Sequence, residues 1–172
     1  AAQSIAPMIL EAGPNGIDLR PTPGTINAES ALPQKIEHYE RGACRSIADF
    51  HGLKLGPNAM ETSYTRRNTA PPYDEVRVIA ARMVSYHDAA VAVSDLAQRL
   101  RTTGAEVGGH WRSEEPYEGW WSAAGKRNFL SWNASTWDAD QSGFAWQSGE
   151  WVFIVTAPRG AFSSEVSKEF PY

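Results

Sequence analysis

The clearest periodicity in the sequence lies in its middle third. Residues 76–86 are rich in β-branched side chains and alternate moderately between apolar and polar positions, which is typical of a strand buried on both faces. The stretch that follows repeats apolar side chains at intervals of three and four residues, the spacing of an amphipathic helix. We expect this helix to span residues 88–103, with Asp88 as its N-cap and Gly104 as its stop.

Residues 105–157 carry short strand-like segments separated by turn residues, the pattern of an antiparallel meander. The clearest hairpin is centred on Ser148-Gly149, which we interpret as a two-residue loop. Side chains that lie directly opposite one another in such a hairpin share a face. One face is therefore expected to carry Phe144, Trp146, Trp151 and Phe153, and the other face Ala145, Val152 and Ile154.

The remaining segments give weaker patterns. Residues 1–34 contain five prolines and three glycines, which exclude a long regular element and predict an extended arm. Residues 35–50 have helix-like apolar spacing, although Gly42 weakens this prediction, and residues 52–73 are expected to be loop. A helical turn is expected over residues 165–170, capped by Ser163 or Ser164.

These elements define the expected fold class as α+β. We predict a single domain over residues 35–172, in which one principal helix packs across an antiparallel β-sheet meander, preceded by the Pro/Gly-rich arm of residues 1–34. A chain of 172 residues with 42% hydrophobic positions can form one core without disulfides or metals. Because one helix covers one sheet face, the other face of the hairpin must meet the arm, a partner or water.

Charge and composition exclude several classes of protein. The formal net charge of −4 and a pI near 5.6 give no cationic field for phosphate backbones, so no nucleic acid partner is expected. The apolar stretches are far shorter than the roughly 20 residues of a membrane span. The sequence starts with small residues and without Met, as after signal-peptide cleavage, so we expect a secreted or periplasmic protein.

The tryptophans are the compositional feature with the most functional interest. All seven lie between Trp111 and Trp151. A small sheet buries large side chains in its core, and we expect four or five of the indoles there. Exposed indoles give rigid contact area for sugar rings or partner proteins. The candidate contact residues for a ligand or partner are Trp120, Trp121, Phe144, Trp146, Trp151 and Phe153.

Residues 138–143 have the D-x-D-x-S-G spacing of a calcium loop. Asp138, Asp140 and Ser142 would supply the oxygen ligands. The twelfth position of a complete loop is Gly149 instead of the bidentate Glu, so we favour an Asp- and Gly-rich β-turn and keep the cation site as the alternative. No cofactor is therefore expected, with calcium as the alternative.

Three glutamates, Glu114, Glu115 and Glu118, lie beside Trp111. Carboxylates next to indoles are the combination that glycosidases use, and an exposed acidic loop beside a core has the same composition. The motifs of serine hydrolases, P-loops and dinucleotide folds are missing from the sequence.

Three functions therefore remain open. The first is an exported, non-enzymatic accessory or assembly subunit that acts by protein–protein contact, or as a homo-oligomer, through its aromatics and its arm. The second is a carbohydrate- or small-ligand-binding module that uses the tryptophan cluster. The third is a hydrolase with acidic residues near Trp111. We favour the first, because a Pro-rich arm loses little entropy on docking.

Overall fold

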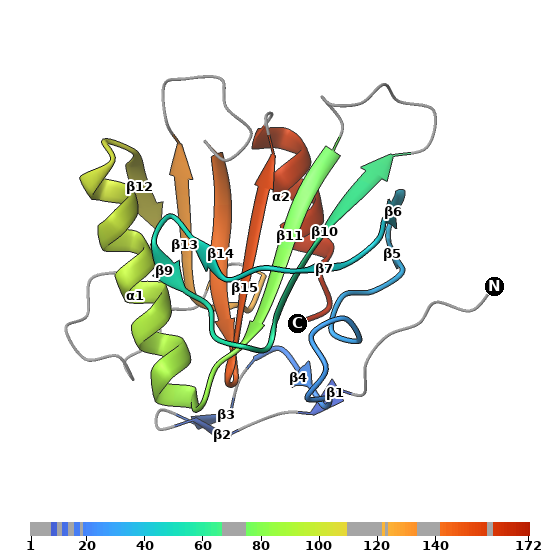
Figure 1. Cartoon of the computed structure of the whole chain (residues 1–172), viewed down its shortest axis with the longest axis horizontal. Coiled ribbons are helices and arrows are strands. Elements are labelled where there is room, and N and C mark those ends of the chain that lie inside the picture. Colours follow the sequence, from blue (N-terminus) through green and yellow to red (C-terminus); the bar gives the residue numbers. More distant parts are fainter. Residues whose placement is uncertain are drawn as a thin grey trace.

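The protein is a single α+β domain with a large antiparallel sheet and two helices (Figure 1). The computed structural model describes residues 8–9, 12–13, 16–17, 19–66, 75–109, 122, 124–133, 142–157 and 160–172. The helices are α1 (Tyr86–Thr102) and α2 (Gly160–Glu169). The long strands are β10 (Ala59–Arg66), β11 (Glu75–Arg82), β13 (Arg127–Asn133), β14 (Ser142–Ser148) and β15 (Trp151–Ala157).

Short strands complete the described part of the fold. They are β1 (Met8–Ile9), β2 (Ala12–Gly13), β3 (Gly16–Ile17), β4 (Thr22–Pro23), β5 (Lys35–Ile36), β6 (Tyr39–Arg41), β7 (Arg45–Ser46), β8 (Asp49–Phe50), β9 (Leu53–Lys54) and β12 (Glu106–Gly109). The main sheet has nine strands in the order β12-β13-β14-β15-β11-β10-β6-β5, with β7 pairing to β10 beside this path. The pairs β1–β4, β2–β3 and β8–β9 form separate two-stranded ladders.

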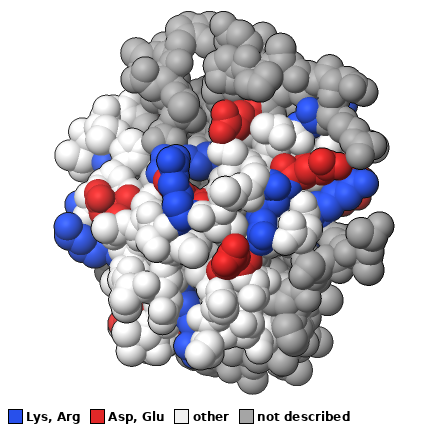
Figure 2. Space-filling view, turned by 45° about the vertical axis from the view of Figure 1, so that its right-hand side comes forward, with Lys and Arg blue, Asp and Glu red and all other residues white. Residues whose placement is uncertain are grey.

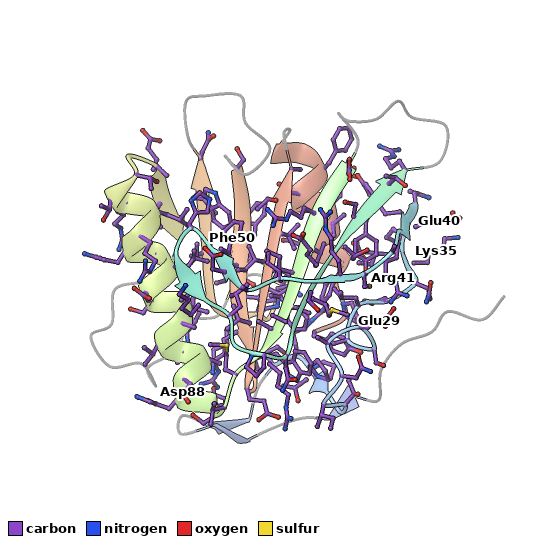
Figure 3. The ribbon with its side chains drawn as sticks, viewed as in Figure 1. Glu29, Lys35, Glu40, Arg41, Phe50 and Asp88 are labelled. Atoms are coloured by element: carbon purple, nitrogen blue, oxygen red, sulfur yellow. The ribbon has the colours of Figure 1, made fainter. Side chains whose placement is uncertain are left out.

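The expected strand and helix in the middle of the chain are present, with shifted ends. Strand β11 stops at Arg82, because Ser85 is the N-cap of α1 and accepts a hydrogen bond from the Asp88 amide at 3.1 Å. The prediction of Asp88 as the cap was therefore wrong, and Asp88 lies in the first helical turn (Figure 3). The helix ends before Gly104, whose φ of 89° is the left-handed conformation that glycine adopts without strain.

The β14–β15 hairpin is present with its loop one residue further on. Ser148 opposes Trp151, so the two-residue loop is Gly149-Glu150 and not Ser148-Gly149. Gly149 has φ of 59°, and a type II′ turn requires glycine at this first loop position. The pairing Trp146 to Phe153 replaces the expected Trp146 to Trp151. The partner of Trp146 changes by two residues, and side chains alternate between faces with a period of two. The predicted division of side chains between the two faces is therefore preserved.

Helix α1 covers the hairpin face that carries the smaller apolar side chains. It packs over β12 to β15, and its buried alanine, valine and leucine side chains meet Ala145, Val152 and Ile154 in one hydrophobic cluster. The β8–β9 ladder extends this cover, because Phe50 and Leu53 belong to the same cluster. In Figure 1, α1 and the β8–β9 ladder lie on one side of the sheet and α2 on the other.

A second helix covers the aromatic face, where the sequence predicted only a turn. Helix α2 packs over β14, β15 and β11. Its Val166, together with Phe170 and Tyr172 beyond its end, is buried against the hairpin aromatics. The ring centroids of Trp146 and Phe153 lie 5.8 Å apart, and those of Phe153 and Phe170 lie 4.9 Å apart. This aromatic cluster is therefore part of the hydrophobic core.

Lys126 fixes the end of α2 to this core. Its side chain is 1% exposed, and its ammonium group donates to the main-chain oxygens of Phe170 at 3.0 Å and Tyr172 at 2.5 Å. The same group lies 4.3 Å from the Trp146 ring centroid. Burial lowers the pKa of Lys126 well below its ordinary value, and the charge of Arg20 lowers it further. Carbonyl oxygens at a helix C-terminus are suitable partners for a buried cation.

The prediction of a helix over residues 35–50 was wrong. This segment forms β5 to β8, and β5, β6 and β8 each turn one apolar side chain inward: Ile36 is 2%, Tyr39 1% and Phe50 3% exposed. Short strands separated by turns can thus imitate helical spacing. Pairing of β6 with β10 replaces the local hydrogen bonds that a helix would make.

The prediction of loop over residues 52–73 was also wrong in part, because β10 is an eight-residue strand inside the sheet. Polar residues in this strand obscured its pattern. Glu61 is only 8% exposed, and its carboxylate accepts hydrogen bonds from Nε of Arg45 and Nε of Arg77, both at 2.6 Å. Paired in this way, a carboxylate can lie on a largely buried strand.

Part of the expected N-terminal arm belongs to the core of its own domain. Ala28, Ala31 and Leu32 are buried in the same cluster as the hairpin aromatics. Arg41 holds this segment in place, because its Nη1 donates to the main-chain oxygens of Glu29 at 3.1 Å and Leu32 at 2.7 Å (Figure 3). The domain boundary at residue 34 stays a prediction.

Two further observations concern the surface. No helix among the described residues has the length and apolar character needed to cross a membrane. On the face shown in Figure 2, acidic and basic side chains are interspersed and do not gather by sign.

Candidate functional site

A pocket of about 500 Å³ opens at one edge of the sheet, and we call it the edge groove. It lies where β12, β13 and β14 approach α2. Helix α2 packs over β14, β15 and β11, so the α2-side face of β12 and β13 is left to line the groove. The lining residues are Glu106, Val107, Gly108, Ser131, Trp132, Asn133, Ser142, Gly143, Phe144 and Ser163.

Strand register places these side chains in two rows. Glu106 of β12 opposes Asn133 of β13, which opposes Ser142 of β14. Residues that oppose one another point to the same face, and neighbouring strands lie about 4.8 Å apart. A carboxylate, an amide and a hydroxyl therefore form a polar row about 10 Å long across three strands.

The second row forms the inner part of the groove. It runs from Gly108 through Ser131 to Phe144. Gly108 has no side chain, which leaves a depression at the outer strand. Phe144 is half-buried at the other end, and its ring centroid lies 5.4 Å from that of Phe129. Ser163 of α2, which is fully buried, completes the wall.

The polar row has a defined hydrogen-bond arrangement. The Ser142 hydroxyl donates to Asn133 Oδ1 at 3.0 Å, so the Asn133 amide nitrogen keeps its two donor positions on the exposed side chain. Glu106 is exposed, and its carboxylate has no ion-pair or hydrogen-bond partner among the described residues. The row thus offers amide donors, one hydroxyl group and one carboxylate, and Glu106 is its one ionisable side chain.

The predicted contact residues fall in different places. Trp146, Trp151 and Phe153 are fully buried in the core and offer no surface to a ligand in this structure. Packing explains this correction, because α2 and residues 28–32 cover the face that the sequence left open. Phe144 does line the edge groove. Trp120 and Trp121 lie outside the described residues.

Of the three candidate metal ligands, one is a described residue. Asp138 and Asp140 lie outside the described residues, whereas Ser142 lines the edge groove and is bonded to Asn133. Within the described part of the chain, His, Cys, Asp and Glu side chains form no group of three or more that could hold a metal ion. The glutamates of the predicted acidic loop and Trp111 also lie outside the described residues.

The sequence did not predict the other groove residues as ligand contacts. Glu106 and Ser131 belong to no motif, Asn133 begins an N-x-S triplet, Ser163 was considered only as a helix cap, and no local spacing links the four. The signal that relates the first three is strand register, since it aligns positions 106, 133 and 142 and positions 108, 131 and 144. A correct prediction of the β12–β13–β14 pairing would have found both rows.

Fold and site together define an α+β domain with a polar groove at the open edge of an antiparallel sheet. No protein-family model matches the sequence, and a search of curated proteins finds no match. Among solved structures, a GTP binding regulator from Thermotoga maritima is similar over 80% of this chain and 82% of that chain, with 12% identity and a TM-score of 0.47. A likeness this distant assigns no function to the chain.

Proposed function

We propose that this domain binds a small polyhydroxylated ligand of the saccharide class in the edge groove. The observation that carries the proposal is the lining of the groove by hydroxyl and amide groups in rows set by the sheet. Its volume of about 500 Å³ lies within the range of about 300–1,000 Å³ for small-molecule sites. Of the ligand classes considered from the sequence, carbohydrate fits this lining best.

The chemistry of the lining supports a hydroxyl-rich ligand without a phosphate or carboxylate group. A sugar hydroxyl donates and accepts, so it can pair with the Asn133 amide nitrogen, with the Ser142 hydroxyl or with Ser131. No Lys, Arg or His side chain is present among the described lining residues, so a phosphate or carboxylate would find no cationic partner there. The exposed part of Phe144 gives an apolar surface for the C–H face of a sugar ring.

Isothermal titration with a panel of neutral disaccharides of different ring configurations tests the proposal. At least one is expected to bind, and the double variant Asn133→Ala with Ser142→Ala is expected to weaken its binding by about 30-fold, since each of the two lost hydrogen bonds costs about 1 kcal/mol. Ser164→Ala is the matched control, because Ser164 is exposed on α2 and is not part of the groove lining. All variants should unfold at the temperature of the parent. Absence of binding across the panel, or unchanged affinity in the double variant, would contradict the proposal.

Contact with a protein partner is the second proposal, carried by the exposed apolar side chains of the N-terminal segment. Leu19 is 62% and Ile26 69% exposed, and exposed apolar residues are common at contact sites. Deleting residues 1–34 would be a poor test, because Leu32 belongs to the core. Export and an accessory role stay predictions from the sequence.

Substitution of the exposed positions tests this second proposal. Size-exclusion chromatography with light scattering is expected to show an oligomer or a co-purifying partner, and Leu19→Ser with Ile26→Ser is expected to dissociate it. Val84→Ser is the matched control, since Val84 is 91% exposed and lies outside this segment. A monomer in both the parent and the double variant would exclude the second proposal and leave the saccharide proposal intact.

A further inference from the structure

We infer that the ligand of the edge groove carries a positively charged amine, as an amino sugar does, and that Glu106 recognises it. The inference rests on the proposed function and adds a charge to the ligand class. Its basis is the position of one carboxylate at the end of the polar row, directly opposite Asn133 in the β12–β13 register.

Glu106 is available for such a ligand. Other carboxylates on the sheet are engaged by arginines: Glu61 pairs with Arg45 and Arg77, and Glu150 pairs with Arg82 at 2.9 Å. The Glu106 carboxylate has no such partner among the described residues, although it lies beside two hydrogen-bonding side chains of the groove. An ammonium group would supply up to three donors to it, whereas a sugar hydroxyl supplies one.

The rest of the row fixes which end of the ligand carries the charge. Because Ser142 donates to Asn133 Oδ1, the Asn133 amide nitrogen presents donors to the groove. Donors repel an ammonium group and suit a hydroxyl or carbonyl oxygen. The amine is therefore placed over β12, at Glu106, and the oxygen-bearing part of the ligand over β13 and β14.

The overall charge acts in the same direction. The chain has a formal net charge of −4, which raises the local concentration of cationic ligands. The attraction between the Glu106 carboxylate and an ammonium group is weakened, because the side chain is exposed and water and salt screen the two charges. Exposed ion pairs of this kind give about a fivefold preference at most.

The experiment compares three disaccharides by isothermal titration: the β-1,4-linked glucosamine dimer with free amines, its N-acetylated form and the β-1,4-linked glucose dimer. The free amine form is expected to bind about fivefold more tightly than the other two at low salt. In Glu106→Gln this preference should disappear, so that the free-amine dimer binds no more tightly than the two neutral dimers. Glu169→Gln is the matched control, because Glu169 is exposed on α2 outside the groove lining. Its preference should equal that of the parent, and added salt should reduce it.

The possible outcomes distinguish failure of the amine inference from failure of the saccharide proposal. Equal binding of all three dimers, or a preference for the amine that survives Glu106→Gln, overturns the inference and leaves the saccharide proposal standing. Absence of binding by all three dimers, and by the neutral panel, overturns both. Loss of the preference in both glutamate variants assigns it to the net charge of the protein and overturns the role of Glu106.

Discussion

Replacing Trp146 with alanine is expected to lower the free energy of unfolding by about 3–5 kcal/mol, the usual cost of truncating a buried tryptophan. The side chain is 0% exposed and lies between Phe129, Phe153 and Phe170 at the centre of the aromatic cluster. The surrounding aromatic rings cannot move freely into the cavity that the substitution leaves, because α2 and two strands hold them in place. Urea unfolding followed by circular dichroism measures the change.

A pair of conservative variants separates packing from hydrogen bonding. Trp146 Nε1 donates to the Tyr172 main-chain oxygen at 3.1 Å, whereas Trp151 Nε1 has no acceptor among the described residues. Both indoles are fully buried, so substitution by phenylalanine removes similar apolar volume. We expect Trp146→Phe to cost about 1 kcal/mol more than Trp151→Phe, the usual net worth of a hydrogen bond. Equal losses, or the reverse order, would show that the Tyr172 contact contributes nothing.

Gly143→Ala is expected to lower the free energy of unfolding by about 3 kcal/mol, at the upper end of the usual cost of overpacking. A Cβ atom at this position would meet the Trp132 ring at 2.5 Å and would also clash with the main-chain oxygen of Val155. Neither neighbour can move freely, because Trp132 is 3% exposed and Val155 lies in β15. The added methyl group must therefore displace a ring or a strand.

Gly108→Ala is the matched control for this prediction. Gly108 lies in the edge strand of the same sheet, and its Cβ would meet only the flexible Ser131 hydroxyl, at 3.2 Å. We expect a change within about 1 kcal/mol, since alanine also restricts the unfolded chain. Thermal unfolding of the two variants is compared with the parent. If Gly143→Ala were as stable as Gly108→Ala, the Trp132 ring would not be tightly packed against β14 and could move to accommodate the added methyl group.

The elements that the sequence predicted well are those whose pattern comes from local spacing. Helix α1 buries one stripe of alanine, valine and leucine side chains, and the hairpin alternates aromatic with smaller side chains around a turn, so both could be recognised without knowing their neighbours. The turn was shifted by one residue because Ser148-Gly149 and Gly149-Glu150 are both acceptable loops by composition. Glycine at the first loop position decided between them.

The elements that were missed depend on distant partners. Glu61 fits inside a sheet only because Arg45 and Arg77 meet it, and these arginines lie 16 residues away on either side. The edge groove depends on distant partners even more, since its two rows lie on three strands and its wall includes a residue of a helix. Single-sequence patterns report periodicity within an element, and they carry no register between elements.

Helix α2 does not cover β12 and β13, and this affects which substitutions the protein tolerates at the edge groove. The side chains of the polar row are exposed or half-buried, and none belongs to either hydrophobic cluster. If the groove binds a saccharide as proposed, substitutions among Glu106, Asn133 and Ser142 are expected to change its ligand preference with little effect on folding. The polar contacts proposed for the ligand come from residues outside the two hydrophobic clusters, so ligand preference is then free to diverge among proteins that keep this same core.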